Sequence, residues 1–287
     1  MSAGPDRIVK KPRLLFQPDP VIGWRLTPGH GVAVQFRDGI VQHIGPDGWR
    51  QVPGAAEKTG PRLGLYGCSF TYGTGLADDE TFAAHLQQAL PGLRILNRGI
   101  GGHGTVQNYL QLRRDIANGS VDTAVFAIIS DHRFRNIAHP QRMRQYQHRE
   151  WYVLGVEHVP VVRLNAAGQP QIRYVPIWQP LLNKGGLETF LPDEYMITTA
   201  TLAVLAEVRA LAAQHALPLR FALLDQLDPD FNTAVTTRFP DTLDISQPHD
   251  GEHRFLPRDI HPNVRAAKLY ASGLAPAVEA LCADLRA

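Results

Sequence analysis

From Leu63 onward, short apolar runs alternate with longer segments whose apolar residues recur at helical spacing, and this alternation limits the possible folds more than any other feature of the sequence. Strands that alternate with helices form parallel βαβ units, so we expect an α/β domain built on a doubly wound parallel sheet. The expected strands are 63–66, 94–97, 123–129 and 219–224, and the expected helices are 80–90, 105–117, 198–215 and 263–285. In such a sheet, functional residues gather where strands end and helices begin.

Two segments depart from the alternation. Residues 1 to about 60 have no helical period, and their apolar runs are broken by turn sequences, which predicts an N-terminal β-rich extension before an α/β domain at 61–287. The stretch from about 131 to 195 predicts an insertion over the active face, with an exposed hairpin formed by 159–164 and 171–175. We expect Asp78 or Asp79 to cap the helix at 80–90, and a polar loop to follow the strand at 219–224.

Composition excludes several classes of partner. The chain has 287 residues, of which 44% are hydrophobic, enough to fill the core of one large domain. The net charge of +2 creates no field that favours nucleic acid or an anionic membrane, and we expect neither as a partner. The N-terminus has charges and prolines where a signal peptide has an apolar stretch, and the two cysteines are far apart, so we expect a cytoplasmic protein with reduced thiols. The sequence leaves the oligomeric state open.

A serine follows the first expected strand, in the segment Gly-Cys-Ser-Phe-Thr-Tyr-Gly at 67–73. This position places the hydroxyl of Ser69 at the catalytic edge of the sheet. A glycine-rich turn whose serine caps the next element is the simpler interpretation of one such motif alone. The segment lacks the G-x-S-x-G elbow of α/β hydrolases, because Thr71 occupies the last position.

A glycine-rich segment, 97–105, follows the second expected strand and opens a helix. Glycines let backbone N–H groups approach an anion, which suits either a phosphate or the oxyanion of an acyl-transfer reaction. Gly99, Gly101 and Gly104 match the spacing of a dinucleotide site, but they follow the second strand, and Asp122, the only acid near the expected distance, precedes a strand instead of ending one. A dinucleotide cofactor is therefore the less favoured alternative, and we expect no cofactor.

Two further segments carry polar residues. Ser130-Asp131-His132 follows the third expected strand, and Asp259-Ile260-His261 lies before the last helix. A carboxylate two residues before a histidine can bind one ring nitrogen and fix the tautomer, which leaves the other nitrogen to accept a serine proton. The simpler alternative for 259–263 is a surface turn in which Asn263 caps the last helix.

In this order, the four segments resemble those of the SGNH or GDSL hydrolases, from about Leu63 to the C-terminus apart from the insertion. The resemblance implies a flavodoxin-like fold and a Ser-His-Asp triad. By position it makes Ser69 the nucleophile, His261 the base and Asp259 its orienting acid. The oxyanion hole would comprise Ser69, Gly102 and Ser130.

The segments also depart from the family pattern. Cys68 stands where the family usually has aspartate, which we interpret as a packing substitution, and Ser130 replaces an asparagine that normally donates to the oxyanion. One residue separates Asp259 from His261, as in the acetyltransferase-like branch that acts on polysaccharides. We therefore expect a serine hydrolase of the carboxylesterase or O-deacetylase type acting on a small-molecule or glycan ester. The alternatives are an O-acyltransferase with the same triad and a degenerate, non-catalytic binding protein.

Other polar clusters are weaker candidates. The segment 247–253 offers histidines and acids to a metal, but its Pro and Gly favour a solvated loop, and we expect no metal site. The basic run after the third segment is of a kind that is mostly solvated surface, but because it follows that segment directly, we expect His132, Arg133 and Arg135 to line a substrate entrance that favours anionic or sugar-rich substrates. A sugar-stacking wall is a further possibility, although covering the hairpin is the commoner role for such aromatic residues, here Trp151, Tyr152, Tyr174 and Trp178.

Overall fold

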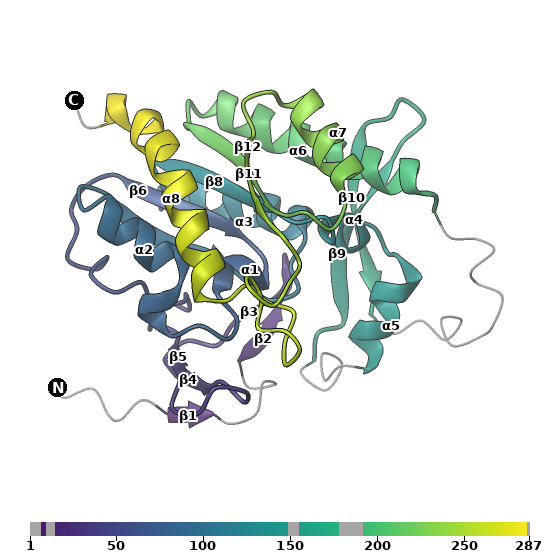
Figure 1. Cartoon of the computed structure of the whole chain (residues 1–287). Helices are drawn as coiled ribbons and strands as arrows, with labels where there is room; N and C mark the ends of the chain where they lie inside the picture. Colours follow the sequence, from purple (N-terminus) through teal and green to yellow (C-terminus); the bar gives the residue numbers. More distant parts are fainter. Residues whose placement is uncertain (1–6, 10–14, 149–154, 178–191, 286–287) are drawn as a thin grey trace.

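A five-stranded parallel sheet forms the centre of the molecule (Figure 1). The structure is a computed structural model that describes residues 7–9, 15–148, 155–177 and 192–285. The sheet has the order β12-β11-β8-β6-β7, which is the flavodoxin-like order 2-1-3-4-5 when these strands are counted along the chain. The fold class expected from the sequence is thus confirmed. The strands are β6 (Arg62–Gly67), β7 (Arg94–Gly99), β8 (Thr123–Ile128), β11 (Leu219–Asp225) and β12 (Leu243–Gln247).

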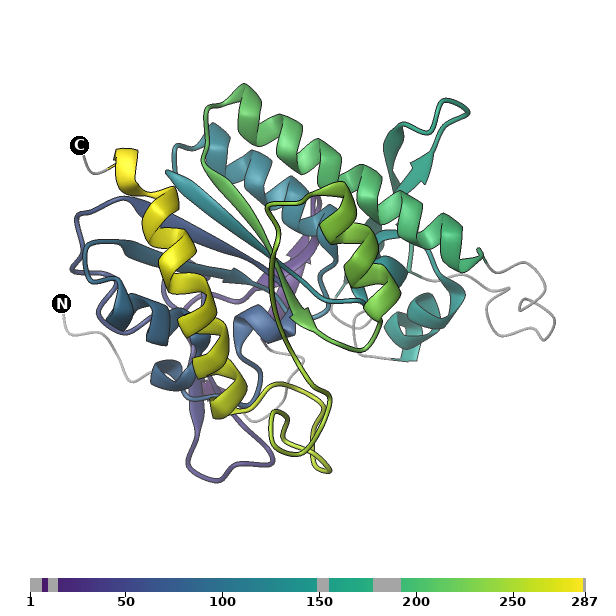
Figure 2. The ribbon, with the colours of Figure 1, turned by 45° about the horizontal axis from the view of Figure 1, so that its top comes forward.

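Helices cover both faces of this sheet (Figure 2). Alternate residues of β8 point to opposite faces: Val125 joins one buried cluster and Phe126 another. The first cluster includes residues of α2 (Phe82–Ala89) and α8 (Val264–Leu281), and the second includes residues of α3 (Thr105–Ala117), α6 (Glu194–Gln214) and α7 (Pro229–Arg238). Both faces of β8 are therefore buried, which explains why its sequence is a continuous apolar run.

The α2 helix begins later than the sequence suggested. Its N-cap is Thr81, whose hydroxyl accepts a hydrogen bond from Ala84 N–H at 3.1 Å. Asp78 belongs instead to the short 3₁₀ helix η2 (Asp78–Glu80), and its carboxylate accepts hydrogen bonds from His43 and pairs with Arg50. The expected cap at Asp78 or Asp79 was therefore wrong, because contacts with the N-terminal extension engage the acidic side chain of Asp78.

The loop expected after the fourth strand contains two further elements, α7 and β12. The α7 sequence is rich in Thr and Asn and buries few apolar side chains, among them Phe231 and Val235, so its helical period is weak. Its start is nevertheless well defined, because Asp228 caps it by accepting from Phe231 N–H at 2.8 Å. β12 is a short edge strand that pairs only with β11 within the sheet.

The N-terminal extension is β-rich, as expected, and shares a buried cluster with the α/β domain. Ile22, Trp24 and Leu26 pack in the same cluster as Tyr72 and Ile100. The extension consists of a hairpin of β2 (Phe16–Asp19) and β3 (Gly23–Leu26) and a sheet of β1 (Arg7–Val9), β4 (His30–Ala33) and β5 (Val41–His43).

The insertion contains the expected hairpin, formed by β9 (His158–Leu164) and β10 (Pro170–Pro176), after the helices α4 (His132–Asn136) and α5 (Pro140–His148). β10 is largely exposed, but Val159 and Val161 of β9 are buried in the cluster that holds Trp24. Of the expected aromatic wall, Tyr174 is exposed, whereas Trp151, Tyr152 and Trp178 lie outside the described residues.

The α6 helix is long and apolar enough to cross a membrane by length and composition alone. Val204, Leu205 and Val208 on one of its faces are nevertheless buried inside the protein. The core helix of a soluble protein can have the same length and composition, so one such helix is weak evidence of a membrane span.

Candidate active site

The four polar segments lie at one edge of the sheet because the strands before them are parallel. The strands that precede the four segments, β6, β7, β8 and β12, end at Gly67, Gly99, Ile128 and Gln247, and their carboxyl ends face the same way. Ser69 begins the single-turn helix α1 (Ser69–Tyr72) directly after β6 and is 8% exposed.

Close backbone approaches fix the Ser69 turn against its neighbours. A Cβ atom at Gly67 would lie 2.0 Å from Thr71 Oγ1, and one at Gly99 would lie 2.3 Å from Tyr72 N. The amide of Asn97 donates to Thr71 O at 2.9 Å and joins β7 to the same turn. Glycine is thus required at Gly99 because the end of β7 is in direct contact with the α1 backbone, and at Gly67 because the Thr71 side chain packs against the end of β6.

The glycines of the second segment contact protein atoms. A Cβ atom at Gly104 would lie 2.7 Å from Asn136 Oδ1, and one at Gly101 would lie 3.3 Å from the Phe16 ring. With Gly99 against α1, all three glycines of the dinucleotide spacing are explained by packing. The expected oxyanion donor, Gly102, has φ of +84°, a left-handed conformation that glycine adopts without strain.

The late loop holds an aspartate–histidine pair beside the α1 turn. His261 Nδ1 and Asp259 Oδ1 are 2.5 Å apart, and the same oxygen accepts from His261 N–H at 2.8 Å. The His261 ring packs edge-on against the ring of Phe70, the residue after Ser69, with centroids 5.8 Å apart. Asn263 caps α8 by accepting from Ala266 N–H at 3.2 Å. The helix cap that the simpler interpretation of 259–263 predicted is therefore present as well.

The environment of Asp259 favours its ionised form. Partial burial opposes ionisation, but the hydrogen bonds and charge of His261 outweigh it and lower the pKa of the carboxyl group. The carboxylate therefore accepts from Nδ1–H, and in the neutral form of the ring this hydrogen bond leaves the Nε2 lone pair of His261 available as a base.

Ser130 is bound to an aspartate that the sequence analysis missed. Its backbone N–H and its hydroxyl donate to the carboxylate of Asp225, at 3.2 Å and 3.3 Å respectively. Asp225 ends β11 and is almost fully buried, and this burial raises its pKa. The sequence signal that could have identified Asp225 is its position directly after the apolar run of an expected strand. Both donors of Ser130 are engaged by Asp225, so its expected role in an oxyanion hole requires these hydrogen bonds to break.

The arginines expected at a substrate entrance are buried and ion-paired within the protein. Arg135 pairs with Asp131 at 2.5 Å and donates to His103 O at 2.8 Å. Arg133 pairs with Asp228 and with Glu194 of α6. These contacts link α4 to the loop after β7, to α6 and to the residue that caps α7. Contact with substrate stays a prediction.

His132 is 1% exposed, and within the described part of the chain neither ring nitrogen has a hydrogen-bond partner. Burial, together with the charge of Arg135, lowers the pKa of His132 well below its usual range, so the ring is neutral at pH 7. Its expected contact with substrate also stays a prediction.

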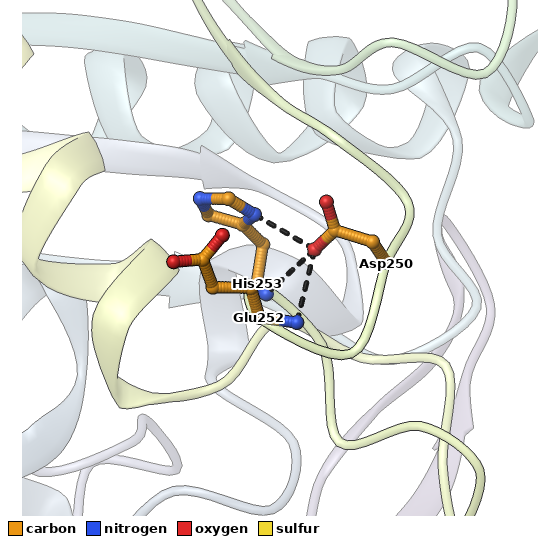
Figure 3. Close-up of side chains that lie close together, drawn as sticks. All are labelled: Asp250, Glu252 and His253. Carbon is orange, nitrogen blue, oxygen red and sulfur yellow. Dashed lines mark hydrogen bonds and ion pairs between the residues drawn. The ribbon is translucent and has the colours of Figure 1, made fainter.

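Among the described residues, Asp250, Glu252 and His253 form the group whose ligand atoms lie close enough together, within 4.8 Å, to hold a metal ion (Figure 3). One oxygen of Asp250 accepts from the backbone N–H groups of Glu252 and His253, each at 3.0 Å, and lies 2.8 Å from His253 Nδ1. These hydrogen bonds explain why the three residues lie close together, because Asp250 stabilises the loop that contains them.

Solved structures similar to this chain include hydrolases and esterases. An α/β hydrolase, LAE5, from the metagenome of Lake Arreo has 14% identity and a TM-score of 0.46, over 80% of this chain and 98% of its own. A putative lipolytic protein of the G-D-S-L family from Desulfitobacterium hafniense has 11% identity and a TM-score of 0.41, over 75% and 98%. A catalytic mutant of Axe2, an acetylxylan esterase from Geobacillus stearothermophilus, has 12% identity and a TM-score of 0.44, over 76% and 94%.

No family model matches the sequence, and neither does any curated protein. The strand order of the central sheet is the flavodoxin-like one that the resemblance of the four segments implies.

Proposed function

We propose that this protein is a serine esterase that uses Ser69, His261 and Asp259. The observation that carries the proposal is the bonded Asp259–His261 pair packed against Phe70, next to Ser69. It supports a base of fixed tautomer beside a hydroxyl at the carboxyl edge of the sheet.

In the proposed reaction, His261 Nε2 accepts the proton of Ser69 Oγ as that oxygen attacks the ester carbonyl. The backbone N–H groups of Ser69 and Gly102 stabilise the oxyanion. The tetrahedral intermediate expels the alcohol, which takes its proton from His261, and leaves an acyl group on Ser69. Water, deprotonated by His261, then releases the acid and restores the serine.

The test is hydrolysis of p-nitrophenyl acetate together with capture of Ser69 by a fluorophosphonate, located by mass spectrometry. Ser69→Ala and His261→Ala should each lower kcat at least about a thousandfold. Ser272→Ala and His249→Ala alter an exposed serine and an exposed histidine and should leave the rate unchanged. A folded wild-type protein that neither hydrolyses the ester nor takes up the probe would contradict the proposal and favour a binding protein.

Acyl transfer to a second alcohol is an alternative outcome of the same chemistry, suggested by the single residue between Asp259 and His261. It would appear as an acyl-enzyme that forms with p-nitrophenyl acetate but turns over slowly until a sugar acceptor is added. The transferred acetyl group would then be found on the acceptor.

A further inference from the structure

A tryptophan from the N-terminal extension makes hydrogen bonds to the loop of the glycine-rich segment 97–105 in the candidate active site. Trp24 is fully buried, and its indole Nε1–H donates to the carbonyl oxygen of Gly101 at 3.0 Å. Its backbone carbonyl lies 3.0 Å from His103 Nε2, and the two rings are in edge contact at 5.1 Å. Trp24 therefore contacts the loop on both sides of Gly102.

The second contact fixes the tautomer of His103. Burial lowers the pKa of His103 to about 3, so the ring is neutral at pH 7. Because a carbonyl only accepts, Nε2 carries the proton and donates it to Trp24 O. A third contact comes from the insertion, where the hydroxyl of Tyr146 donates to Gly102 O at 3.3 Å.

The bond to Gly101 O matters because of the geometry of the peptide unit. The carbonyl of Gly101 and the N–H of Gly102 belong to one rigid plane and point in opposite directions. A donor that fixes this carbonyl also fixes the direction of the Gly102 N–H. Glycines on both sides of the plane would otherwise allow it to rotate, because they have few steric limits.

We propose that Trp24 is a positioning residue that orients the Gly102 N–H for the oxyanion. This inference rests on the proposed esterase function, in which Gly102 is a donor. It assigns part of the active-site geometry to the N-terminal extension, at a position 77 residues before the bound carbonyl in the sequence.

Replacing Trp24 tests this role. Trp24→Phe keeps an aromatic ring but removes the donor, and benzothienylalanine at position 24 removes the N–H while it keeps the shape of the indole. Loss of a whole oxyanion donor typically lowers turnover about a hundredfold to a thousandfold, so a misaligned donor should lower kcat roughly tenfold to a hundredfold. KM should change by less than about twofold, because the oxyanion forms only after binding. Trp49→Phe, also in the extension, is the matched control.

A boronic acid separates positioning from general packing. It forms a tetrahedral adduct with Ser69 and uses the same donors, so its inhibition constant should rise in proportion to the loss of kcat in the position-24 variants. A variant that merely loosens the fold would lose thermal stability and raise KM instead. The benzothienylalanine protein keeps the test valid if Trp24→Phe fails to fold.

The proposal is overturned if the benzothienylalanine protein retains wild-type kcat and boronic acid affinity. That result would leave the esterase function intact. A wild-type protein without esterase activity or labelling at Ser69 would instead refute the function itself, so the two failures are distinguishable.

Discussion

The hydroxyl of Ser130 tests how many donors the oxyanion hole has. If it donates to the oxyanion, Ser130→Ala should lower kcat about a hundredfold to a thousandfold. In the structure it donates to Asp225 instead. We therefore expect Ser130→Ala to lower the kcat for p-nitrophenyl acetate less than about tenfold. A larger loss of kcat, with unchanged stability of the protein, would show that the hydroxyl of Ser130 does donate to the oxyanion.

Asp259 is expected to matter for turnover rather than for substrate binding. Asp259→Asn preserves the size of the side chain but favours the wrong tautomer of His261, and should lower kcat about a thousandfold to ten-thousandfold. Asp250→Asn alters the other aspartate–histidine pair of the same loop and is the matched control. Steady-state kinetics on both variants would show which of the two pairs contributes to turnover. Equal losses of kcat would contradict the assignment of Asp259 as the acid that orients His261.

Residues near each other in sequence were the easier ones to predict. The expected Asp259–His261 bond, for example, spans only two residues of the sequence. The contact of Ser130 with Asp225 spans 95 residues, and that of Trp24 with Gly101 spans 77. Such partners depend on how the strands are ordered and on how the extension folds back, which no local pattern in the sequence specifies.

At the scale of elements, the carboxylate of Asp131 joins the helices α4 and α5. Asp131 pairs with Arg135 of α4 and Arg142 of α5. Its burial opposes ionisation, but the two arginine charges outweigh that effect and lower its pKa to about 2, against 3.8 for the free group. The stabilisation by these ion pairs is therefore complete above about pH 4 and is lost as the pH falls towards 2.

Asp131→Asn should accordingly lower the free energy of unfolding at pH 7 by about 1–2 kcal/mol, after allowance for its partial exposure. The difference from wild type should shrink as the pH is lowered below 4. Urea titrations at several pH values would measure it, with exposed Asp38→Asn as control. A difference that is independent of pH would show that the ion pairs contribute nothing.

Elements with strong hydrophobic periods were predicted well, and those held by tertiary contacts were not. The helix expected at 105–117 coincides with α3, because its period is clear. By contrast, α7 depends on a cap at Asp228 and a few buried side chains, and β12 depends on pairing with β11. Their sequences resemble a polar loop because much of each element faces solvent.

At the scale of the whole molecule, the extension and the α/β domain form one packed unit. The buried cluster around Trp24 joins residues of the extension, the insertion and α3, among them Ile22, Val106 and Val159. A region that shares its core with another cannot unfold without exposing the apolar surface of both. The protein should therefore lose structure in a single transition, although the sequence suggested a boundary near residue 60.

The neighbouring residues Ile22 and Val21 provide the test of this single transition. Ile22 is fully buried, whereas Val21 is 37% exposed. Ile22→Ala should lower the free energy of unfolding by about 2–5 kcal/mol, and Val21→Ala by no more than about 0.5 kcal/mol. In hydrogen exchange, Ile22→Ala should speed the exchange of the slowest amides of β3 and of β6 by the same factor, because both open only with the whole molecule. Faster exchange confined to β3 would mean that the extension unfolds separately, and would also weaken the case that it positions the active site.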